Sequence, residues 1–145
     1  MCMYDDSSGW KVYHESTRRA AKPHICGECH REIAKGETYE NVSGLHYDGD
    51  GWSTFHTCAH CVEAKRWLLR ACRGYMFGMV REDLWEHIGG DEWYLRSAPL
   101  IRIFRWQKAK WVGRDGALRP VADVASVVDR AIAIYARTEA KAVAA

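Results

Sequence analysis

The sequence predicts a mixed α+β fold, with a β-rich N-terminal half followed by a helical C-terminal half. Three observations lead to this prediction. Two cysteine pairs of CxxC spacing, at 26–29 and 58–61, lie in one 36-residue window of a 145-residue chain. Between them, two segments rich in aromatic and β-branched residues flank a turn sequence. After the second pair, apolar residues recur at spacings of three and four, as they do in amphipathic helices.

The two cysteine pairs predict a metal site. Zinc is held tetrahedrally by four thiolates about 2.3 Å away, and a CxxC turn points two of them at one ion. We therefore expect one structural Zn²⁺, bound by Cys26, Cys29, Cys58 and Cys61. The alternatives are buried unliganded thiols, two disulfides or a redox-active CxxC. Four thiolates leave no open coordination position, so the expected zinc stabilises the fold and performs no chemistry.

The elements around the cysteines follow a definite order. Residues 38–47 and 52–57 read as two strands, and the Asp-Gly-Asp-Gly sequence at 48–51 reads as the turn of a hairpin. A helix is expected over residues 59–73, with Glu63, Lys65, Arg66 and Arg70 on its solvent side. A CxxC turn, a hairpin and a CxxC at a helix N-terminus is the order of a treble-clef zinc finger.

The runs at 26–39 and 48–61 resemble a treble-clef finger as a whole. More narrowly, they are similar to those of small uncharacterised bacteriophage and prophage proteins, as are the opening Met-Cys-Met-Tyr-Asp-Asp and the basic stretch 102–120. The resemblance implies a zinc site and a phage or prophage origin, and hence the cytoplasm of a bacterial host, but no biochemical role. One departure is His30, which stands where zinc knuckles often have Gly.

The predicted organisation is one compact unit. Residues 1–22 form an N-terminal arm, residues 23–74 the treble-clef zinc module, and residues 75–145 a helical portion packed on that module. Apolar spacing places three helices in this last portion, over 75–88, 98–112 and 120–140.

The net charge of +2 is unevenly distributed. Residues 93–119 carry seven Lys or Arg against one Asp, interleaved with Trp106 and Trp111. Basic and aromatic side chains together can neutralise phosphates and stack bases, or meet an acidic protein patch. The candidate binding residues in this 96–119 segment are Arg96, Arg102, Arg105, Lys108, Lys110, Arg114 and Arg119.

An enzyme is not expected. Treble clefs underlie HNH-type nucleases, so His46, Asp48, Asp50 and His56 are the residues to consider. The sequence lacks an acidic neighbour for His46 and an Asn after Cys61, which disfavours the nuclease alternative. His56 and His60 are alternative zinc ligands, because each lies beside a cysteine of the second pair.

The remaining features concern location and partners. The chain opens without a signal peptide and has no run of 18 apolar residues, so we expect a cytoplasmic protein with no membrane contact. We expect a non-catalytic binding protein with no small-molecule substrate. Its expected role is that of a phage accessory factor that binds a host protein complex, including an anti-CRISPR-like inhibitor of bacterial defence. The alternative is a nucleic-acid-binding regulator that uses the 96–119 segment.

Overall fold

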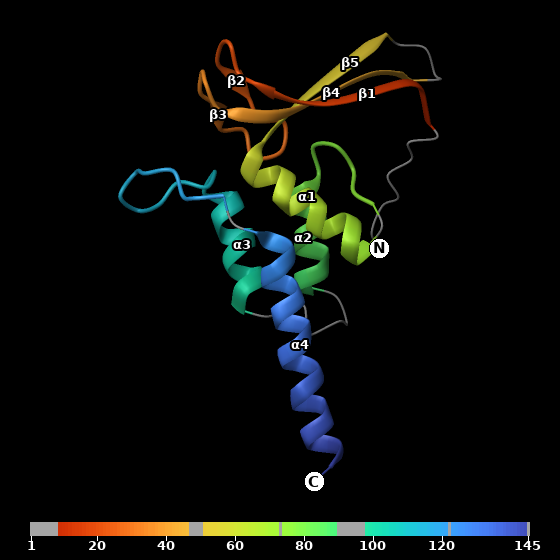
Figure 1. Cartoon of the computed structure of the whole chain (residues 1–145), viewed down its shortest axis with the longest axis vertical. Coiled ribbons are helices and arrows are strands. Elements are labelled where there is room, and N and C mark those ends of the chain that lie inside the picture. Colours follow the sequence, from red (N-terminus) through yellow and green to blue (C-terminus); the bar gives the residue numbers. More distant parts are fainter. Residues whose placement is uncertain (1–8, 47–50, 73, 90–97, 122, 145) are drawn as a thin grey trace.

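A computed structural model describes residues 9–46, 51–72, 74–89, 98–121 and 123–144. Within these ranges, two small antiparallel sheets lie at one end of the molecule, and four helices extend from them (Figure 1). The larger sheet has the strand order β1-β4-β5 and the smaller one the order β2-β3. The strands are β1 (Trp10–Arg19), β2 (His24–Ile25), β3 (Glu32–Ile33), β4 (Thr38–His46) and β5 (Trp52–Cys58).

The larger sheet contains the predicted hairpin. Strands β4 and β5 pair in the register Tyr39↔Cys58 to Leu45↔Trp52, which confirms the two expected strands within a residue or two. The expected N-terminal arm contributes strand β1, which pairs antiparallel with β4 along its length. Residues 1–8 of that arm lie outside the described part of the chain. The β1 strand thus forms one edge of the sheet.

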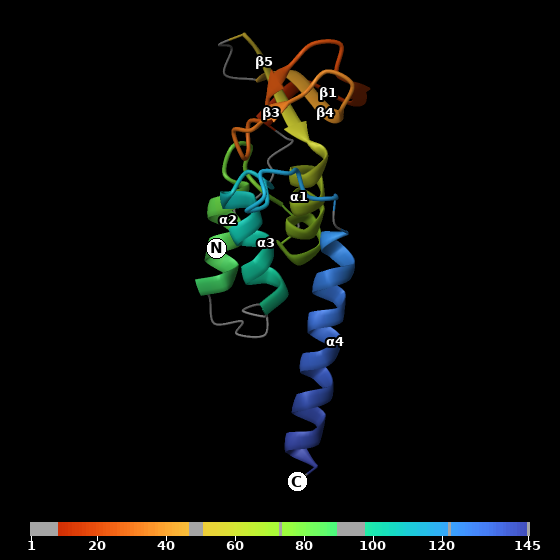
Figure 2. The ribbon, with the colours of Figure 1, turned by 90° about the vertical axis from the view of Figure 1, so that its left-hand side faces the viewer.

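The helices are α1 (Ala59–Cys72), α2 (Val80–Gly89), α3 (Ala98–Lys108) and α4 (Val124–Val143). Helix α1 follows β5 without a loop, as predicted. Helix α4 runs alongside α1 at its start and then extends away from the other helices (Figure 2). Within the described ranges, no helix combines the length and the apolar character needed to cross a bilayer.

Three predicted helix boundaries in the second half were wrong. Helix α2 starts at Val80 instead of residue 75, and α4 starts at Val124 instead of residue 120. The side chain of Asp123 accepts a hydrogen bond from the Ser126 amide and caps α4. Pro120 therefore precedes the helix and does not open it.

Helix α3 ends at Lys108, four residues before the predicted end. The amide of Lys110 donates to the Gln107 carbonyl (2.9 Å) and the amide of Trp111 to the Trp106 carbonyl (2.7 Å), which is a Schellman motif. Lys110 occupies the left-handed position of this motif, with a φ of 55°. Glycine normally stands there, so the sequence carried no stop signal at this point.

The core lies where α1 meets the sheets, α2 and α3. Trp67 and Leu68 of α1 are buried together with Ile33, Leu84 and Ile103. One prediction for α1 was wrong, because Lys65 is only 3% exposed instead of facing solvent. Its ammonium group pairs with Glu40 of β4 and lies 4.8 Å from the ring centre of Tyr75. Burial of this charge is compensated by the carboxylate and by the face of the aromatic ring.

Candidate metal centre

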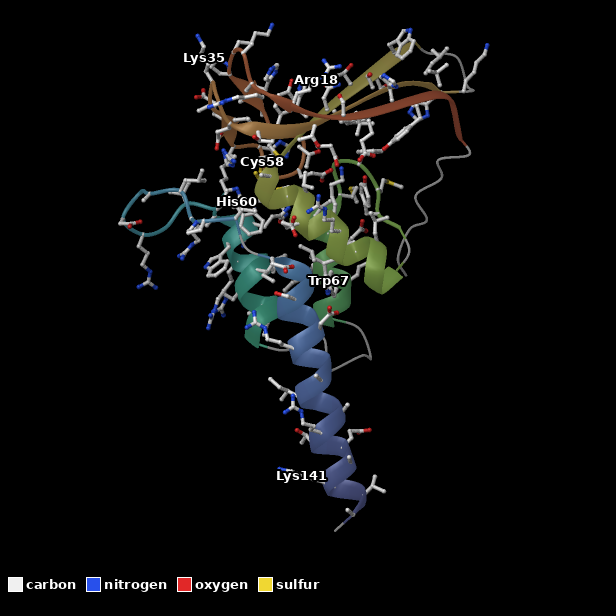
Figure 3. The ribbon with its side chains drawn as sticks, in the orientation of Figure 1. Arg18, Lys35, Cys58, His60, Trp67 and Lys141 are labelled. Carbon is white, nitrogen blue, oxygen red and sulfur yellow. The ribbon has the colours of Figure 1, made fainter. Side chains whose placement is uncertain are left out.

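Four cysteines from two distant parts of the chain converge at the junction of the sheets and α1. Cys26 and Cys29 belong to the turn between β2 and β3, Cys58 ends β5, and Cys61 lies in the first turn of α1. All four are buried, and their sulfur atoms lie within 4.8 Å of one another. Figure 3 shows Cys58 at the point where the sheet meets the helix. This confirms the cluster that the CxxC spacing predicted.

The spacing of the sulfur atoms suits a metal ion. A tetrahedral site with bonds of about 2.3 Å places its sulfurs roughly 3.8 Å apart. The sulfurs of Cys29 and Cys58 are 3.8 Å apart, whereas a disulfide requires about 2.05 Å. The four cysteines are therefore free thiols that can hold a metal ion such as zinc. Soft sulfur donors in a closed, buried set fit a structural ion.

Backbone hydrogen bonds shape the turn that carries the first cysteine pair. The amide of Cys26 donates to the Arg31 carbonyl (2.9 Å), and the amide of His30 donates to the Cys26 carbonyl (2.9 Å). His30 takes the left-handed conformation, with a φ of 59°. This conformation costs a non-glycine residue about 1–2 kcal/mol, but the turn forms without the glycine that knuckles often have. The departure at His30 thus leaves the turn intact.

Hydrogen-bond donors surround the sulfur atoms of the four cysteines. The Cys58 amide donates to Cys26 Sγ (3.4 Å), and the indole Nε1–H of Trp111 donates to Cys61 Sγ (3.3 Å). The hydrogen bonds that the other three thiols, Cys26 first among them, donate to its sulfur lower the pKa of Cys58. Four thiolates on a divalent ion would carry a net charge of −2, so the Cys58 amide and the Trp111 indole, which keep their protons when a metal binds, would stabilise the metal-bound form.

Arg31 and His60 link the centre to the C-terminal half. Burial opposes the charge of Arg31, but its bonds to Glu37 and the negative charge of Cys58 outweigh burial and raise its pKa. One Arg31 nitrogen lies 3.4 Å from His60 Nδ1, and His60 Nε2 lies 2.6 Å from the Arg119 carbonyl oxygen. A carbonyl only accepts, so Nε2 carries the proton and Nδ1 accepts from Arg31. Both ring nitrogens are engaged, and His60 stands outside the sulfur cluster.

Glu28, inside the first CxxC, connects the centre to α2. Its two carboxylate oxygens accept hydrogen bonds from the amides of Gly78 (3.0 Å) and Val80 (3.2 Å) at the start of that helix. Burial raises the pKa of Glu28, and the two amide donors partly offset this effect. A carboxylate at a helix N-terminus satisfies free amides and complements the helix dipole. Glu28 therefore explains why α2 begins at Val80.

We expect the substitution Glu28→Gln to destabilise the zinc-loaded protein by about 1–3 kcal/mol. The amide retains one acceptor oxygen but turns an NH₂ group toward the second backbone amide, which leaves a buried donor unsatisfied. Urea unfolding followed by circular dichroism measures the loss. Glu82→Gln is the control, because Glu82 is 42% exposed in a surface ion pair with Arg81. Equal stability of the two variants would contradict this role for Glu28.

The predicted basic residues do not all share one environment. Arg102, Arg105 and Lys108 are exposed on α3, and Lys110 and Arg114 are exposed in the segment that follows it. Arg119 is half-buried, with its guanidinium 4.6 Å from the Trp106 ring centre. The seventh predicted residue, Arg96, lies outside the described residues.

The residues considered for a nuclease do not join the sulfur cluster. His46 is the last residue of β4, and the ring of His56 lies 4.3 Å from that of His24. Asp48 and Asp50 lie outside the described residues. Sequence reasoning missed Glu28, Arg31 and Trp111 as supports of the centre, because their contacts join positions up to 52 residues apart.

Comparisons with known proteins find no match to this chain among protein families, curated proteins or solved structures.

Proposed function

We propose that this chain is a non-catalytic binding protein built on a zinc-stabilised treble clef. The order of its elements supports the proposal: a cysteine-bearing turn, the β4–β5 hairpin and a helix whose first turn carries the last cysteine. Four buried cysteines would fill the tetrahedral shell of a zinc ion and would leave no open position for a water or a substrate. Zinc in this role contributes to folding and does not activate a nucleophile.

The proposed partner is a protein, and a groove between α2 and α3 carries this proposal. Trp85 is 57% exposed and lies 5.1 Å from Phe104, ring centre to ring centre. These two rings line a cavity of about 440 Å³, together with Arg81, Glu82, Glu86 and Lys108. An exposed tryptophan on an aromatic neighbour, rimmed by charges of both signs, is typical of a protein-binding hot spot. With the resemblance to phage proteins, this suggests an accessory factor that binds a host protein complex.

The substitution Trp85→Ala tests the proposed groove. We expect it to weaken binding to the specific host partner at least tenfold, measured by calorimetry after that partner has been isolated from the bacterial host with the intact protein. Trp52→Ala is the matched control, because Trp52 is 64% exposed on β5, away from the groove. Equal effects of the two substitutions, or failure to isolate any specific partner, would argue against the proposal.

A nucleic-acid-binding regulator is the second candidate. Arg102, Arg105 and Lys108 recur every third residue on α3 and are all exposed, which favours contact with phosphates. We expect an electrophoretic shift that weakens between 50 and 200 mM salt and disappears when all three charges are reversed. No shift at low salt would remove this candidate, and it would leave the protein-binding proposal untouched.

A further inference from the structure

Residues 111–119 form a small hairpin beyond the end of α3. The Arg119 amide donates to the Trp111 carbonyl (2.9 Å), and Val112 and Leu118 form an antiparallel bridge. In Figure 1 this hairpin is part of the light-blue loop that projects away from the helices. Its chain enters and leaves at one place, so its position depends on what its two root residues contact.

One root residue contacts a cysteine of the metal centre, and the other contacts the histidine beside that cysteine. The Trp111 indole donates to Cys61 Sγ (3.3 Å), and its ring stacks on that of His60 at 5.3 Å. The carbonyl of Arg119 accepts the His60 Nε2–H bond at 2.6 Å. Figure 3 shows His60 at the start of α1, facing this loop. A ligand residue and its neighbour therefore hold both ends of the hairpin.

The backbone at the first root residue is unusual. Lys110 and Trp111 have φ values of 55° and 62°, so two consecutive L residues are left-handed. Such a conformation persists only where its surroundings hold it. Trp111 is 1% exposed, and this turn carries its indole into the centre. The Lys110 ammonium adds a contact to the His30 carbonyl at 3.4 Å, beside the first cysteine pair.

We propose that Trp111 couples metal binding to the position of the 111–119 hairpin. An N–H group bonds more strongly to a metal-bound thiolate than to a neutral thiol, so the ion holds the hairpin in place. By linkage, the hairpin strengthens metal binding by the same factor. Arg114 and Arg119 belong to this hairpin and Lys110 directly precedes it, so metal binding sets the arrangement of part of the basic surface. That last step rests on the proposed binding role of the basic residues, whereas the coupling itself does not.

The substitution Trp111→Phe tests the coupling in the zinc-loaded full chain. Phenylalanine retains much of the ring packing but lacks the N–H donor. We expect competition with a chelator to show a 10–100-fold loss of zinc affinity, the range typical of groups that orient metal ligands. Trp52→Phe on β5 is the control and should match the wild type. In the cobalt-substituted protein, Trp111→Phe should shift the thiolate-to-cobalt charge-transfer band, which a loss of packing alone does not predict.

Limited trypsin digestion at saturating zinc reports the hairpin itself. We expect Trp111→Ala to speed cleavage after Lys110 and Arg114 at least tenfold, with the rate at other sites unchanged. Wild-type zinc affinity and cobalt spectrum in Trp111→Phe would overturn the proposal. Weaker zinc binding with unchanged cleavage in Trp111→Ala would overturn the coupling as well. These measurements require no partner, so a failure of the proposed binding function would leave their outcome intact.

Discussion

Replacement of Cys58 by serine should abolish zinc binding and unfold the hairpin, α1 and the segments packed on them. Cys58 joins β5 to α1, is fully buried and lies 3.8 Å from Cys29. Zinc binding typically contributes about 10–16 kcal/mol to small structural sites, which is comparable to the total stability of most domains, so a chain that no longer holds the ion should not stay folded. The wild type should contain one zinc per chain by elemental analysis, and Cys58→Ser should contain none and aggregate.

Cys2→Ser is the control for this experiment. No other cysteine lies two or three residues from Cys2, so its loss should leave zinc content and solubility unchanged. Identical behaviour of the two variants, or wild-type protein without zinc, would refute the assignment of the four ligands. Treatment of the wild type with a strong chelator should reproduce the unfolding seen in Cys58→Ser, and added zinc should reverse it.

Replacement of Lys65 by alanine should destabilise the zinc-loaded protein by about 3–5 kcal/mol. Lys65 is 3% exposed, and its partner Glu40 is 12% exposed. Removal of the ammonium group leaves a carboxylate largely buried without a counter-charge and exposes the rings of Tyr75 and Phe77 to the vacated space. Urea unfolding at saturating zinc measures this loss.

A double variant separates the buried charge from the lost packing. Lys65→Met combined with Glu40→Gln removes both charges while retaining most of the volume, and should recover most of the stability. Arg66→Ala is the surface control, because Arg66 is 63% exposed in its pair with Glu63 and should contribute less than about 1 kcal/mol. Comparable losses for Lys65→Ala and Arg66→Ala would show that the Lys65 pair is not effectively buried.

Local patterns were sufficient wherever the determining contacts are close in sequence. The CxxC pairs predicted the sulfur cluster, because two-residue spacing by itself places two thiols on one side of a turn. The Asp-Gly-Asp-Gly sequence and its flanking β-branched residues predicted the pairing of β4 with β5. The start of α1 directly after Cys58 followed from the same local signals. The phage origin and the treble-clef assignment remain predictions.

Local patterns failed where distant groups decide the structure. Periodicity placed Lys65 on the solvent-facing side of α1. The fold brings the carboxylate of Glu40 and two aromatic rings next to its ammonium group, and these compensate the cost of burying the charge. Helix α2 begins at Val80, where the carboxylate of Glu28, 52 residues earlier, satisfies the first amides. Helix α3 ends at Lys108, because Lys110 adopts the left-handed conformation that sequence rules assign to glycine.

The sequence by itself therefore determined the cluster of four cysteines, the hairpin and the existence of the helices, because spacing and periodicity act over a few residues. Only the tertiary structure showed what surrounds those cysteines: Trp111 at Cys61, Arg31 beside Cys58 and His60 bonded to Arg119. The physical reason is that a buried set of thiolates requires hydrogen-bond donors and positive charge from whichever segments the fold places next to it.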